Sequence, residues 1–167
     1  MTLPNKDGAK VRFPPPLVFL GAIIAGVIVQ RVATPLSLKV AAGIRVAAGV
    51  LILVCGTSLV ISARTWFTRT GQSPIPWKPT PELILQGTYR FTRNPMYVGV
   101  LTVILGWAVL FQAAALGLYA LIVGTCFHLF IVLYEERHLQ QEFGDEYEAY
   151  RRRVSRWLPR LRHRPAA

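Results

Sequence analysis

Acidic residues are scarce in this chain. Asp and Glu account for 8 of its 167 residues, against 19 Lys and Arg. All charged residues together make up 16% of the sequence, below the ~25% of an average soluble domain. The apolar residues are gathered in long runs, so the composition predicts an integral membrane protein.

The motifs of common soluble nucleotide and metal enzymes are also missing. The sequence has no GxGxxG, P-loop or HExxH, which excludes a soluble Rossmann cofactor domain. The two cysteines, Cys55 and Cys126, lie inside apolar runs, where small core residues are a better interpretation than a disulfide or a metal site. Nucleic-acid binding would need a soluble basic face with stacking aromatics, so the basic surplus is assigned to topology and anionic lipid.

The apolar runs predict an all-α integral membrane protein with about four transmembrane helices. Residues 95–134 carry no formal charge apart from His128. As one helix they would be ~60 Å long, twice a bilayer core of ~30 Å, so this run must fold back near residues 111–112 or Gly117. The predicted organisation is a loose arm (1–15), two transmembrane helices (16–63, with spans at about 16–30 and 46–63), a cytoplasmic Pro-rich connector (64–94), a transmembrane hairpin (95–134) and a cytoplasmic amphipathic tail (135–167), in which Gly144 interrupts the helix.

The distribution of Lys and Arg predicts the orientation. With four spans, three of these residues in the N-terminal arm, five in the connector and eight in the C-terminal tail share one side of the membrane. The other side has only Arg31, Lys39 and Arg45. The positive-inside rule then places both termini in the cytoplasm, and the short chain suggests a bacterial inner membrane.

Three ionisable residues near the end of the hairpin are candidates for chemistry. Glu135 and Glu136 form an acidic pair at membrane depth, where carboxylates are functional candidates by default. They are as readily explained as solvated partners of nearby arginines. His128 lies seven residues earlier, which predicts the same helix face, two turns deeper. A histidine in an apolar span is more often satisfied by a neighbouring helix than catalytic.

The segment Asn94–Tyr97 begins the hairpin. Pro95 suits the first helical turn and Asn94 is a favourable N-cap, which accounts for both residues structurally. Tyr97 fits an interfacial aromatic belt. The structural interpretation does not explain why Arg93 and Tyr97 flank this segment, nor why Gly87 and Tyr89 lie just upstream.

The ordered motifs of residues 83–159 resemble those of the isoprenylcysteine carboxyl methyltransferase and phospholipid methyltransferase superfamily, whose members are small integral membrane enzymes that use S-adenosylmethionine. Each motif alone is weakly specific, and the ordered set is specific. The motifs are Gly87-Thr-Tyr89, Arg93-Asn-Pro-Met-Tyr97-Val-Gly99, Glu135-Glu136-Arg-His-Leu139 and Phe143-Gly-Asp-Glu-Tyr147-Glu-Ala-Tyr150-Arg-Arg-Arg-Val154.

The resemblance implies a cofactor site for S-adenosylmethionine and no metal. The implied cofactor-binding residues are Leu83, Ile84, Tyr89, Asn94, Pro95, Met96, Tyr97 and Glu135. Arg93, Glu136 and His128 are the candidate catalytic residues, Arg93 as a fork for the cofactor carboxylate and the other two as candidate bases. Two positions depart from the family pattern. Asn94 replaces the usual His, and Ile131 stands where the prenylcysteine enzymes have an Arg near the substrate.

The expected reaction is methyl transfer from S-adenosylmethionine to a lipophilic acceptor that arrives from the bilayer. Isoprenylcysteine-like carboxylates, lipid amines and small lipophilic thiols or acids all remain open as acceptors. Two rival functions remain open too: an NADPH-dependent reductase of the sterol-reductase type, and a catalytically inactive membrane partner. Membrane lipids are the expected partners, nucleic acid is not, and the oligomeric state is left undetermined.

Overall fold

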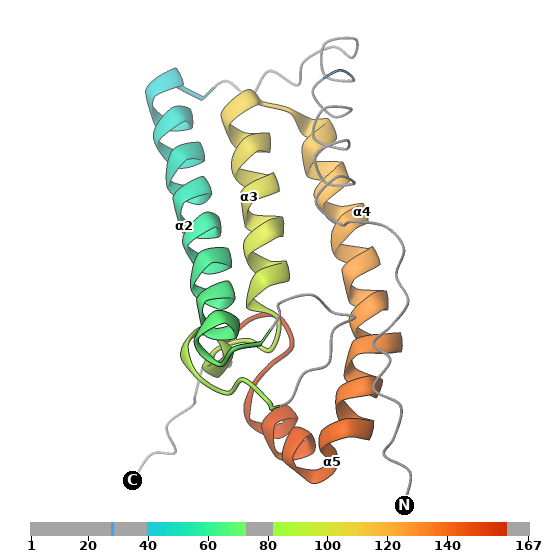
Figure 1. The fold of residues 1–167 in the computed structure, drawn as a ribbon. Helices are drawn as coiled ribbons and strands as arrows, with labels where there is room; N and C mark the ends of the chain where they lie inside the picture. Colours follow the sequence, from blue (N-terminus) through green and yellow to red (C-terminus); the bar gives the residue numbers. More distant parts are fainter. Residues whose placement is uncertain (1–27, 29–39, 73–81, 160–167) are drawn as a thin grey trace, which may run out of the picture.

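Three helices stand side by side and a fourth folds beneath them in the computed structural model (Figure 1). The structure describes residues 28, 40–72 and 82–159. The predicted N-terminal arm and the first span at about 16–30 therefore lie outside the described residues, apart from Ile28. The elements are α2 (Ala42–Arg69), the 3₁₀ turn η1 (Gly87–Arg90), α3 (Pro95–Phe111), α4 (Ala114–Phe130), the π-helical turn η2 (Ile131–Glu135) and α5 (Glu136–Arg153).

Within the run 95–134 the structure contains the two helices α3 and α4 and a turn between them, and their placement across a membrane stays a prediction. The chain reverses at Gln112, whose positive φ of 53° ends α3, and α4 begins two residues later. Gly117, the alternative turn position, lies inside α4. Helix α2 is longer than the predicted span at 46–63, because it continues to Arg69 and so includes the first residues assigned to the connector.

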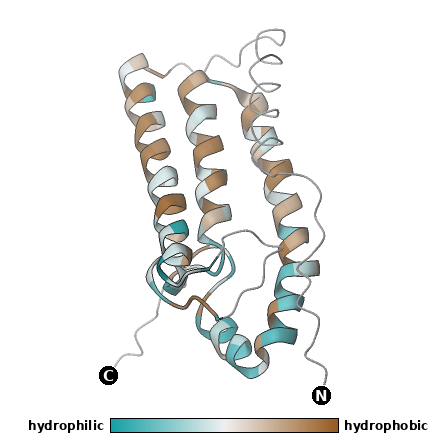
Figure 2. Ribbon diagram, viewed as in Figure 1, coloured by the Kyte–Doolittle hydropathy of each residue, from teal (hydrophilic) through white to brown (hydrophobic). Residues whose placement is uncertain are grey.

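The outer faces of α2, α3 and α4 are apolar and exposed, as a lipid-facing surface must be (Figure 2). Helix α2 and the continuous helix Ala114–Arg153 are long and apolar enough to cross a membrane, and α3 is a shorter apolar helix. The described part of this membrane protein thus contains two candidate membrane spans and a shorter apolar helix, and the arrangement of four spans stays a prediction. Cys55 and Cys126 are exposed on these outer faces, so the prediction that they are core residues is wrong.

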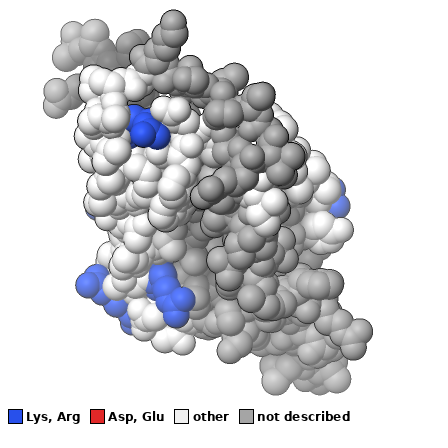
Figure 3. All heavy atoms as spheres, turned by 90° about the horizontal axis from the view of Figure 1, so that it is seen from above, with Lys and Arg blue, Asp and Glu red and all other residues white. Residues whose placement is uncertain are grey.

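The two ends of the helices differ in charge. Viewed from the end where α3 turns into α4, the visible surface of the described residues has isolated Lys and Arg patches and no acidic residue (Figure 3). The hydrophilic residues instead gather around η1 and α5, at the opposite end (Figure 2). Every polar contact of the candidate site described below lies at this polar end.

Glycines allow α2 and α3 to pack with their backbones close together. A Cβ atom added to Gly56 would lie 2.8 Å from the backbone nitrogen of Val103 and 2.9 Å from the carbonyl oxygen of Gly99. A Cβ on Gly99 would in turn lie 2.9 Å from the carbonyl oxygen of Gly56. Small residues at such positions are typical of helix pairs in membranes, where packing rather than water exclusion holds helices together.

Two irregular turns shape the polar end. The π-helical residues Ile131–Glu135 join α4 to α5, and π turns are often found at functional sites. Gly144 has φ 49° and ψ −119° and kinks α5, as the sequence predicts. After this kink Tyr147 and Tyr150 face inward and are buried.

We predict that Gly56→Ala destabilises the protein. The new methyl group would meet backbone atoms of α3 at less than 3.0 Å, so the helices must separate, which costs ~1–3 kcal/mol. Gly43→Ala in the same helix is the control, because a Cβ added to Gly43 would have nothing within 4 Å. Thermal unfolding in detergent should show a lower Tm for Gly56→Ala alone. Equal Tm values for the two variants would contradict the close packing of α2 and α3.

Candidate functional site

A buried carboxylate between two arginines is the strongest polar feature of the structure. Arg156 donates from Nε to Glu136 Oε1 (2.7 Å) and from Nη2 to Glu136 Oε2 (2.8 Å). Arg93 Nη1 lies 2.9 Å from Glu136 Oε1 and also donates to the hydroxyl of Tyr147 (3.2 Å). The side chains of Arg93 and Glu136 are each 9% exposed. The forked hydrogen bond to Glu136 raises the pKa of Arg156, which stays charged.

The chain that follows α5 is tied to the start of α3 by further hydrogen bonds. The backbone N–H of Arg93 donates to the carbonyl of Ser155 (2.9 Å). The carbonyl of Arg156 accepts from the hydroxyl of Thr92 and from Nδ2 of Asn94, both at 3.0 Å. These bonds fix the C-terminal end of the described chain against the first turn of α3.

Asn94 therefore does something other than the sequence predicts. It stands at the N-cap position of α3, but its side chain makes no capping hydrogen bond. Its amide is instead used for the carbonyl of Arg156, and its own backbone N–H donates to Thr92 Oγ1 (3.3 Å). The predicted N-cap position is confirmed, but the side chain does not cap the helix, because a long-range partner uses it instead.

A tyrosine–carboxylate pair lies beside the ion cluster. Tyr97, in the first turn of α3, donates from its hydroxyl to Glu135 Oε2 (2.9 Å). The Tyr97 ring centroid lies 4.7 Å from that of Phe127 on α4. Tyr97 therefore contacts the α4–η2 segment twice, through its ring and through its hydroxyl. Tyr97 is the hydrogen-bond partner of Glu135 among the described residues, which leaves the carboxylate with acceptor capacity for a ligand.

Tyr89 and its neighbours form the floor of this region. Tyr89 is 8% exposed and packs with Ile84, Ala63 and the partly buried Met96. Its backbone carbonyl accepts from the Tyr150 hydroxyl (2.8 Å), which links η1 to α5. Burial and the nearby charge of Glu135 raise the pKa of Tyr89, so its phenol stays neutral.

Gly87 has a structural reason for being glycine. Its φ of 58° lies in the left-handed region, and an added Cβ would overlap the indole of Trp66. The edge of the Trp66 ring therefore rests directly on the backbone of η1. A side chain at this position would displace the turn that carries Tyr89.

His128 lies apart from the acidic pair. It is exposed, its ring stacks with Trp157 at 6.2 Å, and its Nδ1 accepts a hydrogen bond from Trp157 Nε1 (3.3 Å). Because an indole N–H can only donate, neutral His128 carries its proton on Nε2 in this arrangement. The expectation that His128 and Glu135 share a face assumed α-helical spacing, and the wider π turn between them breaks that spacing.

The structure thus brings most of the predicted site residues to one end of the helices. The hydrogen-bonded and packed group comprises Ile84, Tyr89, Arg93, Asn94, Met96, Tyr97, Glu135 and Glu136, with Pro95 buried in the first turn of α3 and Leu83 half-buried next to Ile84. Their roles in binding and catalysis remain predictions. Arg156, Thr92 and Trp157 have no functional signal in the sequence, because nothing distinguishes one arginine of a basic tail from another before the tail is folded.

The donor and acceptor groups of this region fit the amino-acid end of S-adenosylmethionine. Such a ligand offers an ammonium, which a carboxylate such as Glu135 would pair with, and a carboxylate, which needs a donor. Arg93 Nε is buried and has no hydrogen-bond partner in the described part of the chain. Glu136 is the weaker candidate for direct chemistry, since both of its oxygens are used by arginines.

The fold and the site together define a membrane protein with a polar, carboxylate-containing site at one end of its apolar helices. A model of the family described as phospholipid methyltransferase matches residues 44–146. This match covers more than half of the chain, from α2 to α5, so the protein belongs to the phospholipid methyltransferase family.

Two similar proteins from Bradyrhizobium diazoefficiens carry the names methanethiol S-methyltransferase 1 and 2. They are 38% and 40% identical over 72 and 73 residues, which is 42% and 44% of this chain. The matched segments cover 24% and 27% of those relatives, about a quarter of their lengths. An uncharacterized protein from Haemophilus influenzae is 33% identical over 63 residues, 38% of this chain and 100% of that protein. No solved structure matches this chain.

We predict that Glu136→Gln strongly destabilises the fold. The variant leaves Arg93 buried without its carboxylate, and removing one member of a buried ion pair costs ~3–5 kcal/mol. Glu142→Gln is the matched control on the same helix, where the carboxylate pairs with the exposed His138 at 3.2 Å and contributes below ~1 kcal/mol. Denaturant unfolding in detergent measures both values. Similar losses for the two variants would mean that the ion cluster does not hold the polar end together.

Proposed function

We propose that this protein is a membrane-embedded methyltransferase that uses S-adenosylmethionine and acts on a lipophilic acceptor. Membership of the phospholipid methyltransferase family supports the reaction class. The observation that carries the proposal is the Tyr97–Glu135 pair, which puts an aromatic ring and a carboxylate next to each other at the end of an apolar hairpin. Bound there, S-adenosylmethionine would supply a methyl group activated by a sulfonium.

In this proposal each residue of the pair has a separate task. Glu135 accepts hydrogen bonds from the ammonium of the ligand, and the Tyr97 hydroxyl holds the carboxylate in position. The electron-rich face of Tyr97 favours a positive charge nearby by ~0.5–2 kcal/mol. Arg93 donates from its unpaired Nε to the ligand carboxylate while Glu136 keeps the guanidinium fixed. Alignment of donor and acceptor then lowers the barrier, since oriented reactants react much faster than free ones.

The acceptor that fits best is a small lipophilic thiol. Two relatives bear the name of a thiol methyltransferase. Ile131, at the position where the prenylcysteine enzymes have an Arg, is 1% exposed and offers no charge for an acceptor carboxylate. A thiol needs no such cation and reacts as the thiolate once its proton has passed to water, whereas an isoprenylcysteine-like carboxylate would need the cation. A lipid amine has to react unprotonated, which apolar surroundings such as those of Ile131 favour, so it ranks between the two.

We expect detergent-purified wild type to bind S-adenosylmethionine and S-adenosylhomocysteine in calorimetry. Glu135→Gln should weaken S-adenosylmethionine about tenfold or more, because a hydrogen bond to a charged group contributes ~1.5–3 kcal/mol. Tyr97→Phe should weaken it less, since the carboxylate remains. Glu142→Gln should bind as the wild type does.

Three outcomes would contradict the proposal in different ways. Folded wild type that binds NADPH but not S-adenosylmethionine would indicate a reductase. Binding of neither ligand, with lipid present, would indicate a catalytically inactive partner. An unchanged affinity of Glu135→Gln for S-adenosylmethionine would mean that the cofactor does not bind at the Tyr97–Glu135 pair. Where the cofactor binds, labelled-methyl transfer to alkane thiols, compared with a prenylated cysteine and a lipid amine, ranks the acceptors.

A further inference from the structure

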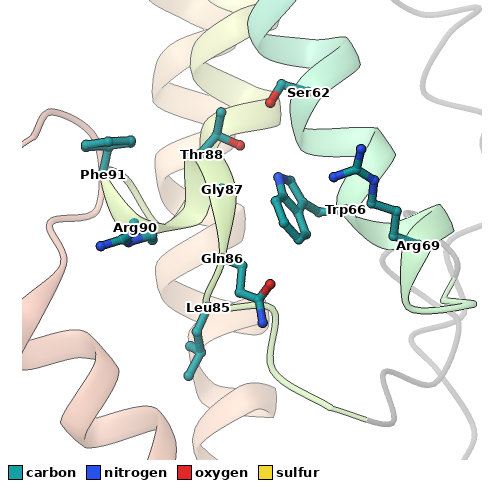
Figure 4. A pocket seen from close by; sticks show the side chains of 9 residues that line it. All are labelled: Ser62, Trp66, Arg69, Leu85, Gln86, Gly87, Thr88, Arg90 and Phe91. Carbon is teal, nitrogen blue, oxygen red and sulfur yellow. The ribbon is translucent and has the colours of Figure 1, made fainter.

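A groove with both polar and apolar lining residues lies between η1 and the last turns of α2 (Figure 4). Its volume is about 780 Å³. From α2 it receives Ser62, Trp66 and Arg69. From η1 and the residue before it come Gln86, Thr88 and Arg90. None of these residues belongs to the ion cluster or to the Tyr97–Glu135 pair.

The groove is positively charged. Arg69 and Arg90 are both exposed, and neither pairs with a carboxylate within the described ranges. None of the described residues that line the groove is acidic. The guanidinium of Arg69 lies 5.1 Å from the centre of the Trp66 ring, and this cation–π contact holds it beside the groove. An anion is the ligand for which this charge is suited.

An uncharged donor in the groove lacks a protein partner. The hydroxyl of Thr88 is buried and makes no hydrogen bond in the described part of the structure. The indole nitrogen of Trp66 packs against the backbone of Gly87, so it is not available to a ligand. Buried polar groups are almost always satisfied in native proteins, so the unsatisfied Thr88 hydroxyl, in a groove that two arginines also line, indicates an acceptor-rich ligand.

The position of the groove identifies the kind of anion. It lies at the end of α2, where the apolar surface of the helices gives way to hydrophilic residues (Figure 2). Phe91, which also borders the groove, is 62% exposed, as aromatic residues at a membrane–water interface commonly are. Phospholipid phosphates occur at this depth, and their oxygens accept hydrogen bonds without donating any.

We propose that this groove binds the phosphate of an anionic phospholipid headgroup. Arg69 and Arg90 provide the charge, and the Thr88 hydroxyl provides a neutral donor to the phosphate oxygens. The acyl chains then lie along the apolar exterior of α2. The site is separate from the cofactor site, and it does not depend on methyl transfer.

The test is native mass spectrometry of the detergent-purified protein with phosphatidylglycerol and phosphatidylcholine at equal concentrations. We expect wild type to retain phosphatidylglycerol in preference to phosphatidylcholine. Arg69→Gln should weaken phosphatidylglycerol about fivefold, because a basic residue near an anionic lipid contributes this much binding. Arg69→Gln with Arg90→Gln should weaken it more than about tenfold. Phosphatidylcholine retention should stay unchanged in both.

Arg64→Gln is the matched control, because Arg64 is an exposed arginine of α2 that does not line the groove. It should bind phosphatidylglycerol as the wild type does. Thr88→Val keeps the side-chain shape, removes the hydroxyl and should weaken phosphatidylglycerol with no loss of Tm. Equal weakening by Arg64→Gln, or no lipid preference in folded wild type, would overturn the proposal. Displacement of the lipid by millimolar inorganic phosphate would overturn it in favour of a free phosphate site.

Discussion

The polar end of this protein depends on one buried carboxylate. Glu136 joins Arg93, which precedes α3, to Arg156, which follows α5, with contacts of 2.7 to 2.9 Å. The chain after α5 is thereby held against the first turn of α3, where Thr92 and Asn94 bind the carbonyl of Arg156. Because Glu135 is the residue before Glu136, the same contact places the carboxylate that meets Tyr97.

The membrane makes this arrangement possible. The glycine-lined contact of α2 and α3 needs no large core, so most apolar side chains face outward to lipid. The hydrophilic residues gather at the end where the helices leave the apolar region (Figure 2), and the ion cluster and the Tyr97–Glu135 pair lie there. A site at this boundary can receive a charged, water-soluble ligand from the aqueous side and an apolar ligand from the bilayer. This is the geometry that the proposed reaction requires.

The sequence was informative about elements and much less so about partners. The length of the run 95–134 predicts the hairpin, because a bilayer is too thin for one helix of that length, and the kink at Gly144 follows from its residue type. The motifs also place Tyr97 and Glu135 in one region, although their contact spans 38 positions. By contrast, the sequence predicts a local helix cap for Asn94, whereas its side chain binds the carbonyl of Arg156, 62 residues away. His128 was aligned with Glu135 by α-helical spacing, which the π turn between them alters. Long-range pairing and irregular turns have no local signal.

Hydrogen–deuterium exchange of Arg156→Gln against wild type tests most directly whether the Glu136 cluster holds the polar end together. The amide of Arg93 donates to the carbonyl of Ser155 at 2.9 Å, so its protection reports whether the chain after α5 stays docked. The account predicts faster exchange at Arg93 and at residues 154–156 in the variant, with α2 and the middle of α3 unchanged. Equal protection in both proteins would mean that the docking, and with it the position of Glu135, does not depend on this ion cluster.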